Sequence, residues 1–174
     1  MDKVDVTQGD LSTAIVARLQ TALGLNDRNC FETIAPDQPN MVPGGDFFVT
    51  VSPGGGQFEQ GEQSAPNVTE YTDVVVTAYT RIRTDSTGHD QQLLQDLKRG
   101  LLTLKRMLLK ALVGQWLNPA YNLRQSVYAR GSEAPKVLQD AHAGTLLGAI
   151  SVTFGVDFDW DLLTSDQNMP QSGP

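Results

Sequence analysis

Three aspartates, Asp157, Asp159 and Asp161, alternate with large apolar residues near the end of the 174-residue sequence. On a β-strand, residues two positions apart share a face at a spacing of about 7 Å, so neighbouring carboxylates could share Ca²⁺ or Mg²⁺. A solvated row whose like charges discourage edge-to-edge aggregation explains the same spacing without a ligand. The row could also offer an acidic surface to a basic partner. Because no other pattern points to a cation, we predict that the row holds no metal.

Three consecutive glycines, Gly54, Gly55 and Gly56, could belong to a phosphate-binding loop. Such a loop needs a helix directly after it and a closing Gly-Lys-Ser or Gly-Lys-Thr, because the helix amides and the lysine hold the phosphate. Neither feature follows these glycines. Since glycine supplies the backbone conformations of tight turns, the run predicts a flexible hairpin tip.

The residues that could act as nucleophile or base are few and lie outside recognised motifs. The chain has one cysteine, Cys30, and two histidines, His89 and His142, with no triad or zinc-protease signature around them. Neither Ser126 nor Ser151 lies in a Gly-x-Ser-x-Gly elbow. We therefore predict a protein that is not an enzyme and that has no cofactor.

The charges are distributed unevenly along the chain, which has 13 basic and 20 acidic residues and a net charge of -7. A helix predicted from Asp90 to Val113 carries five of the basic residues and no acidic residue between 98 and 110. At about 100° per residue the five cover an arc of about 140°, opposite the leucine face, with two further leucines inside the arc. The basic residues are Lys98, Arg99, Lys105, Arg106 and Lys110, and the leucines are Leu102 and Leu109.

Two interpretations of this basic helix face remain open. It could be a solvated face whose positive charge is favoured near the C-terminal end of a helix. It could instead contact an acidic surface, plausibly on a neighbouring copy, with the row from Asp157 to Asp161 as one candidate for that surface. A protein that is acidic overall but has one basic stripe suits head-to-tail contacts, which close into a ring when the rotation allows.

Hydrophobic periodicity predicts the elements that position these residues. Two amphipathic helices and an alternating pattern of strands predict an α+β domain, in which an antiparallel sheet of four to five strands has both helices packed on one face. Prolines and glycines between Pro36 and Asn67 predict long surface loops around one strand. The expected helices are Leu11–Leu23 and Asp90–Val113, and the expected strands are Cys30–Ala35, Asp46–Ser52, Val68–Thr84, Ile150–Leu162 and, less regularly, Tyr121–Ala129.

Length and composition set the remaining limits. Residues 1–163 are expected to form a single domain and residues 164–174 a flexible C-terminal tail, since the tail has no apolar pattern. The acidic balance argues against a general nucleic-acid binder, and no run of about 18 apolar residues predicts a membrane span. The first residues lack the pattern of a signal peptide.

The order of these elements resembles one protein family. The features that carry the resemblance are the Leu11–Leu23 helix, the run from Thr72 to Val76 that leads to Tyr79, the Leu93–Leu112 helix and the closing Ile150–Trp160 strand. Together they resemble the tail terminator (tail completion) proteins of tailed bacteriophages, of the type that caps the lambdoid tail tube. The resemblance covers residues 8–163 as an order of elements and not as a sequence motif.

The resemblance implies a non-enzymatic virion protein of the tail or neck, present in the host cytoplasm during assembly. It implies a homohexameric ring that stops the tail tube, meets the head-tail connector (stopper) protein and lets DNA pass through its lumen. Another neck or head-completion protein, or a non-viral acidic adaptor domain, are the alternatives.

Two groups of contact residues are expected in such a ring. The first would form the contact between subunits: Lys98, Arg99, Leu102, Lys105, Arg106, Leu109, Lys110, Asp157, Asp159 and Asp161. The second would contact the tail tube and the connector from loops: Gly44, Gly45, Gly54, Gly55, Gly56 and Phe58.

Overall fold

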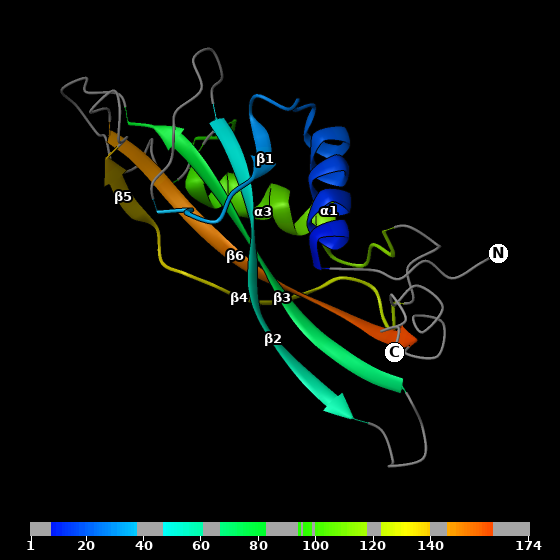
Figure 1. Ribbon diagram of the computed structural model, residues 1–174. Helices are drawn as coiled ribbons and strands as arrows, with labels where there is room; N and C mark the ends of the chain where they lie inside the picture. The colour runs from blue at the N-terminus through cyan, green and yellow to red at the C-terminus, as the bar shows by residue number, and fades with distance from the viewer. Residues whose placement is uncertain are drawn as a thin grey trace, which may run out of the picture.

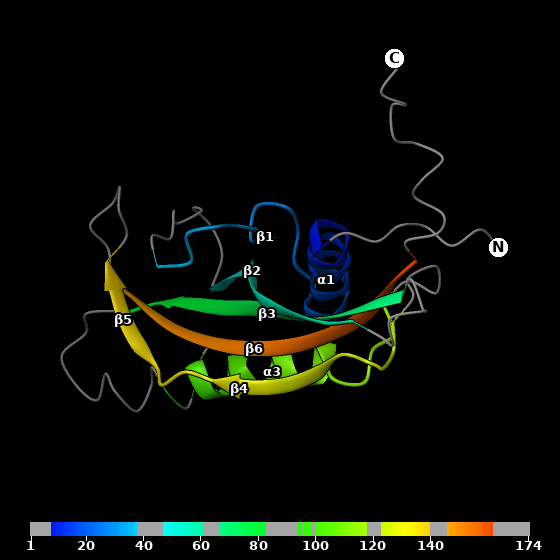
Figure 2. The same cartoon turned by 60° about the horizontal axis from the view of Figure 1, so that its bottom comes forward.

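A curved sheet carries the helices of the protein (Figures 1 and 2). The computed structural model describes residues 8–37, 47–60, 67–82, 94, 96–98, 100–117, 123–139 and 146–161. Within these residues the sheet has six strands in the order β1-β2-β3-β6-β4, and β5 also pairs with β6. The strands are β1 (Cys30–Glu32), β2 (Phe47–Gln60), β3 (Asn67–Arg81), β4 (Tyr128–Ser132), β5 (Lys136–Gln139) and β6 (Leu146–Asp161).

Strands β3 and β6 form the longest pairing of the sheet. They are antiparallel and remain in register from Asn67 opposite Asp161 to Arg81 opposite Leu147. Both segments are rich in β-branched and aromatic residues, which favour extended backbone. With β2 on its other side, β3 is a central strand of the sheet.

Both described helices, α1 (Gln8–Leu23) and α3 (Leu101–Leu112), pack on the same face of the sheet. Leucines and Ile15 on these helices join one buried cluster with Val76 of β3 and Val152 of β6. Arg18 of α1 also donates a hydrogen bond from Nε to the Ala111 carbonyl of α3 at 3.2 Å. The predicted α+β class with two helices on one face is confirmed; the sheet has one strand more than expected, and β1 runs parallel to β2.

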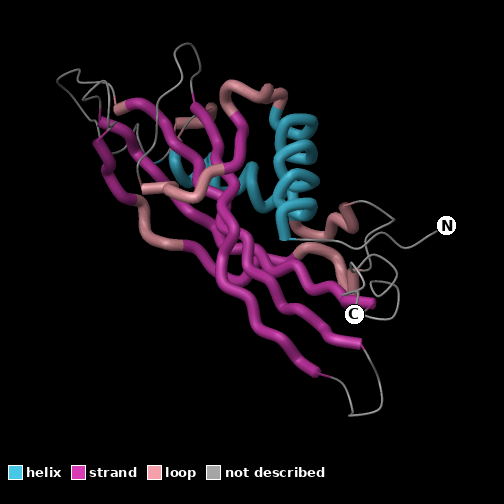
Figure 3. The backbone as a smooth tube through the Cα atoms, in the orientation of Figure 1, coloured by secondary structure: helices cyan, strands magenta, loops and turns pink. Residues whose placement is uncertain are grey.

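The prediction that Pro53 and the three glycines end a strand is wrong. Strand β2 continues through them as one extended segment (Figure 3) and ends at Gln60. Its pairing with β3 shifts register between Pro53 and Gly56. Proline is tolerated there because β1 pairs only as far as Val51, so the edge of β2 beyond it needs no N–H donor. Glycine is needed at position 54, since a Cβ there would lie 2.7 Å from the Asp73 carbonyl oxygen. The triple glycine therefore forms a bulge and not a hairpin tip.

The long helix predicted from Asp90 is also shorter than expected, because α3 begins at Leu101. Gly100 has an extended backbone, with φ -61° and ψ 142°, which interrupts the helical path. Asp96 stabilises the preceding turn: its carboxylate accepts from the Lys98 amide at 2.8 Å and its carbonyl accepts from the Thr103 hydroxyl at 2.8 Å. Lys98 therefore lies in a turn, and Arg99 and residues 90–93 fall outside the described residues.

The remaining boundaries differ more modestly. Strand β1 ends at Glu32 and not at Ala35, and β4 begins at Tyr128 and not at Tyr121. Strand β5 is not among the expected strands. The expected tail, 164–174, lies outside the described residues.

One close approach in the sheet gives a direct test of the fold. A Cβ added at Gly155 would lie 2.6 Å from the Tyr128 hydroxyl oxygen, because the tyrosine ring covers this glycine from the neighbouring strand. We expect Gly155→Ala to lower the free energy of unfolding by about 1–3 kcal/mol, since the ring must move. Urea titration followed by circular dichroism measures this loss.

Gly131→Ala is the matched control, because a Cβ at Gly131 meets nothing within 4 Å. Equal stability of the two variants would contradict the placement of Tyr128 over Gly155.

Candidate functional site

The exposed face of α3 combines apolar and basic side chains. Leu102 is 47% exposed, and Val113, directly after the helix, is 45% exposed. With Leu109, which is partly buried, they recur at spacings of seven and four residues and so form one stripe. Arg106 and Lys110 flank the stripe and are exposed, and among the described residues neither has an acidic partner. The helix thus presents an apolar stripe with a basic border to the exterior.

Two further features extend this α3 face along the chain. Trp116 follows the helix and is 58% exposed, and Leu97 lies exposed in the turn before it. Lys105 is held at the other side of the stripe, where its Nζ donates to the Ser132 hydroxyl of β4 at 2.5 Å. Large apolar side chains that remain in contact with water over such a stretch are typical of a surface that binds another protein.

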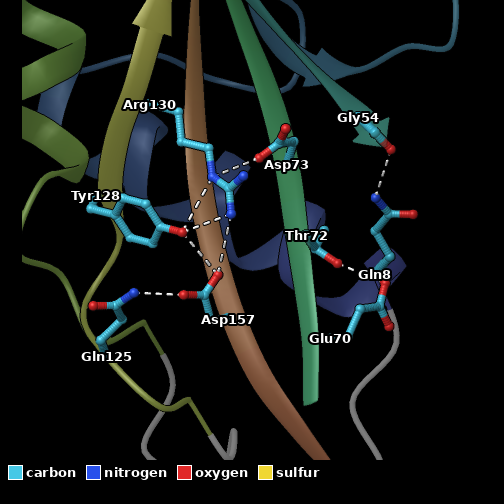
Figure 4. Close-up of polar contacts among 9 residues, drawn as sticks. All are labelled: Gln8, Gly54, Glu70, Thr72, Asp73, Gln125, Tyr128, Arg130 and Asp157. Atoms are coloured by element: carbon cyan, nitrogen blue, oxygen red, sulfur yellow. Dashed lines mark hydrogen bonds and ion pairs between the residues drawn. The ribbon is translucent and has the colours of Figure 1, made fainter. Parts of the chain in front are cut away.

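The aspartates of β6 behave differently from the predicted wet row. Asp157 is only 2% exposed, and Ser151 on the same face is buried as well. Asp157 accepts hydrogen bonds from the Gln125 amide at 2.5 Å and from the Tyr128 hydroxyl at 3.1 Å (Figure 4). The prediction that this whole face is solvated is therefore wrong, because the segment leading into β4 supplies side chains that cover it.

Arg130 joins two acidic residues on neighbouring strands (Figure 4). Its guanidinium lies 3.0 Å from the Asp73 carboxylate of β3, in an ionic contact without hydrogen-bond geometry, and 3.8 Å from Asp157. Arg130 Nη2 also donates to the Tyr128 hydroxyl at 2.8 Å. This hydrogen bond, helped by the two carboxylates, raises the pKa of Arg130, while burial is the main cause that raises the pKa of Tyr128. Arg130 therefore keeps its positive charge throughout the neutral range.

The outer part of the row is more accessible. Asp159 is 30% exposed on its side chain and accepts from the Thr69 hydroxyl at 2.7 Å, with Arg124 Nε at 3.4 Å. For Asp161 only the backbone is described, paired with Asn67. The sequence placed Asp157 and Asp159 on one face correctly but did not predict the burial of Asp157. It also missed Gln125, Tyr128 and Arg130, which no motif marks.

The residues considered for chemistry give little support to an active site. Cys30 is buried, and burial, with a smaller contribution from Asp27, raises its pKa to about 12, which keeps it a thiol. Ser151 shares a hydrogen bond of 3.0 Å with Thr77 inside the sheet. His89 and His142 lie outside the described residues. Within the described part of the chain, no group of three or more His, Cys, Asp or Glu could hold a metal, and no helix is long and apolar enough to cross a membrane.

The described residues that were expected in contact loops belong to strand β2. Gly44 and Gly45 lie outside the described residues, and Gly54, Gly55 and Gly56 belong to strand β2. Phe58 also lies in β2 and is 68% exposed, on the edge that β1 leaves uncovered. A depression of about 520 Å³ lies near the start of this edge, lined by Gln8, Gly9, Ser12, Glu32, Thr33, Ile34 and Pro53.

No protein-family model matches the chain, and no curated protein matches it. A chain of a solved structure described as "Virion of native gene transfer agent (GTA) particle" is similar with a TM-score of 0.45 and 17% identity. The likeness covers 87% of this chain and 96% of that one. At this level it carries no argument about function, which has to come from the surfaces described above.

The contacts of Arg130 predict that replacing Arg130 lowers the stability of the protein more than replacing Arg124, the other arginine of the same segment. We expect Arg130→Met to lower the free energy of unfolding by about 1–3 kcal/mol, because it leaves Asp157 buried without its cation, although the partial exposure of Arg130 limits the cost. Arg124→Met should cost less than about 1 kcal/mol, since that arginine forms a surface ion pair. Chemical denaturation compares the two variants, and equal losses would show that the Arg130 contacts do not form.

The raised pKa of Cys30 predicts an inert thiol. In the native protein at pH 8 we expect no reaction with a thiol reagent such as DTNB, because both the thiolate fraction and the access are low. Full reaction of one thiol per chain should follow in denaturant. Rapid modification of the native protein would contradict the burial of Cys30.

Proposed function

We propose that this chain is a structural protein that assembles with copies of itself through the α3 face, and that it serves as a ring-forming tail terminator in a phage-like virion. The observation that carries the proposal is the apolar stripe of α3, in which Leu102 and Val113 are exposed and Leu109 is partly buried, together with its basic border. A solvated helix would place charged residues at these positions. An apolar stripe of this kind gains free energy when another surface removes it from water.

The distribution of charge favours other copies of the same chain as that surface. The segment 98–110 contributes five positive charges to a chain with a net charge of -7, so the rest of the protein is strongly acidic. A basic stripe on an acidic protein attracts the acidic surface of the next copy and repels its basic stripe. Contacts between two different surfaces are heterologous, and they close into a ring if the rotation between copies allows it.

The tail-terminator role rests on the order of elements together with this mode of assembly. In that role a hexameric ring would cap the tail tube and meet the head-tail connector, with DNA passing through its lumen. The exposed Phe58, on the uncovered edge of β2, would then be available to contact the tube. The protein would act in the tail or neck of the virion after assembly in the host cytoplasm, and it would not act as an enzyme.

Charge reversal at the centre of the α3 face tests the self-assembly. We expect Arg106→Glu to weaken self-association by at least about tenfold, because like charges then face each other across the contact. Light scattering coupled to size-exclusion chromatography measures the mass over a range of concentrations. A higher salt concentration should also weaken the self-association of the wild-type protein, because salt screens the attraction between opposite charges.

Arg28→Glu is the matched control, since it makes the same charge change at an exposed position in the turn after α1. Unchanged assembly of Arg106→Glu would mean that the α3 face is only solvated. A wild-type protein that stays monomeric at high concentration and with purified tail tubes would contradict the proposed function. A single stoichiometric complex with a basic host protein would favour the adaptor alternative.

A further inference from the structure

The structure describes a surface on the same chain that complements the α3 face. Strands β2, β3 and β6 extend past the helices as an arm (Figure 1), which we define as residues 56–60, 67–73 and 155–161. These segments contain six carboxylates and no lysine or arginine, namely Glu59, Glu70, Asp73, Asp157, Asp159 and Asp161. The arm is therefore the most acidic part of the described sheet.

The register places four of these carboxylates, those of Glu59, Asp73, Asp157 and Asp159, on one face. Paired residues share a face of a sheet, and successive residues alternate between faces. Val74 and Val76 of β3 point to the helices, so Asp73 and Tyr71 point the other way. Asp157 lies opposite Tyr71, and Glu59 and Asp159 both lie opposite Thr69. We call this surface the acidic face of the arm; it comprises Glu59, Asp73, Asp157 and Asp159.

The protein's own arginines neutralise this face only in part. Arg130 bridges Asp73 and Asp157, and Arg124 pairs with Asp159. Glu59 is exposed and accepts a hydrogen bond from the Tyr71 hydroxyl at 2.5 Å, a contact that leaves its negative charge in place. Among the described side chains, two guanidinium groups therefore face four carboxylates. The excess negative charge lies at the outer edge of the arm, around the exposed Glu59, where a second molecule has access.

A single chain cannot bring its own two surfaces together. The helices pack on one face of the sheet and the acidic face is on the opposite one, so the α3 face and the acidic face of the arm point away from each other. Within the described ranges no residue joins the two surfaces, so each is available to another molecule. If that molecule is the same chain, every copy uses its α3 face toward one neighbour and its arm toward the other.

We propose that the α3 face of one copy lies on the acidic face of the arm of the next, with Arg106 and Lys110 against Glu59 and Asp159. This inference rests on the proposed self-assembly and names the surface that receives α3. The leucines of the stripe would pack against the half-buried Tyr71, which lies between the carboxylates. Charge complementarity determines that the contact joins the α3 face of one copy to the arm of another. A contact between two α3 faces, or between two arms, would bring like charges together.

A charge-swap experiment tests this contact with two variants of the full chain. The first reverses the helix, Arg106→Glu with Lys110→Glu, and the second reverses the arm, Gln57→Lys with Glu59→Lys. Gln57 is exposed and lies opposite Tyr71, so both arm changes are on the acidic face. Each variant alone should lose self-association by about tenfold or more. An equimolar mixture should assemble again, since each contact then pairs opposite charges, and so should one chain that carries all four changes.

The control pair, Glu133→Lys with Gln139→Lys, makes the same charge change at exposed positions near the other edge of the sheet and should assemble like the wild type. Circular dichroism verifies that all variants are folded. A helix variant that fails and is not rescued by the arm changes would overturn the arm as partner while leaving self-assembly through α3 intact. A helix variant that assembles normally would overturn the proposed function itself.

Discussion

The pairing of β3 with β6 is the interaction on which the rest of the structure depends. Its register is unbroken from Asn67 opposite Asp161 to Arg81 opposite Leu147, and it fixes which residues of both strands share a face. One face carries Val74, Val76 and their partners into the core beneath α1 and α3. The other carries the aspartates of the arm. A slip by one residue would exchange the two faces, so the core and the acidic surface are specified by the same ladder.

In the described part of the chain, polar contacts and aromatic packing cover the second face of this ladder, while α1 and α3 lie on the first. Phe48 and Tyr79 stack with ring centroids 4.5 Å apart, and Thr77 and Ser151 share a hydrogen bond at the centre of the sheet. Toward the arm, Tyr128 and Arg130 reach across from β4. These contacts hold the acidic side chains on rigid strands, which suits a surface that has to meet a neighbour in one orientation.

Much of the fold could be predicted because the spacing of apolar residues along a helix or strand reflects which side chains are buried. The α1 face with Leu11, Ile15 and Leu19, and the core-facing residues of β6, are buried as the patterns predict. The errors arise where tertiary context decides. Pro53 lies within a strand because no neighbour needs its N–H, and Asp157 is buried because Arg130, distant in sequence, covers it. Gly100 ends a helical pattern that the leucine spacing alone would continue. The basic and apolar residues of the α3 face could be recognised in the sequence. The acidic face of the arm could be recognised only from the register of the paired strands.

Zero-length cross-linking between copies tests the central claim, the head-to-tail contact of α3 with the arm, most directly. Wild-type protein labelled with ¹⁵N is mixed with unlabelled protein, treated with a carbodiimide and digested for mass spectrometry. The account predicts mixed-isotope cross-links that join Lys110 or Lys105 to Glu59 or Asp159. Mixed-isotope cross-links that leave these lysines unmodified, or that join them only to carboxylates outside the arm, would contradict it.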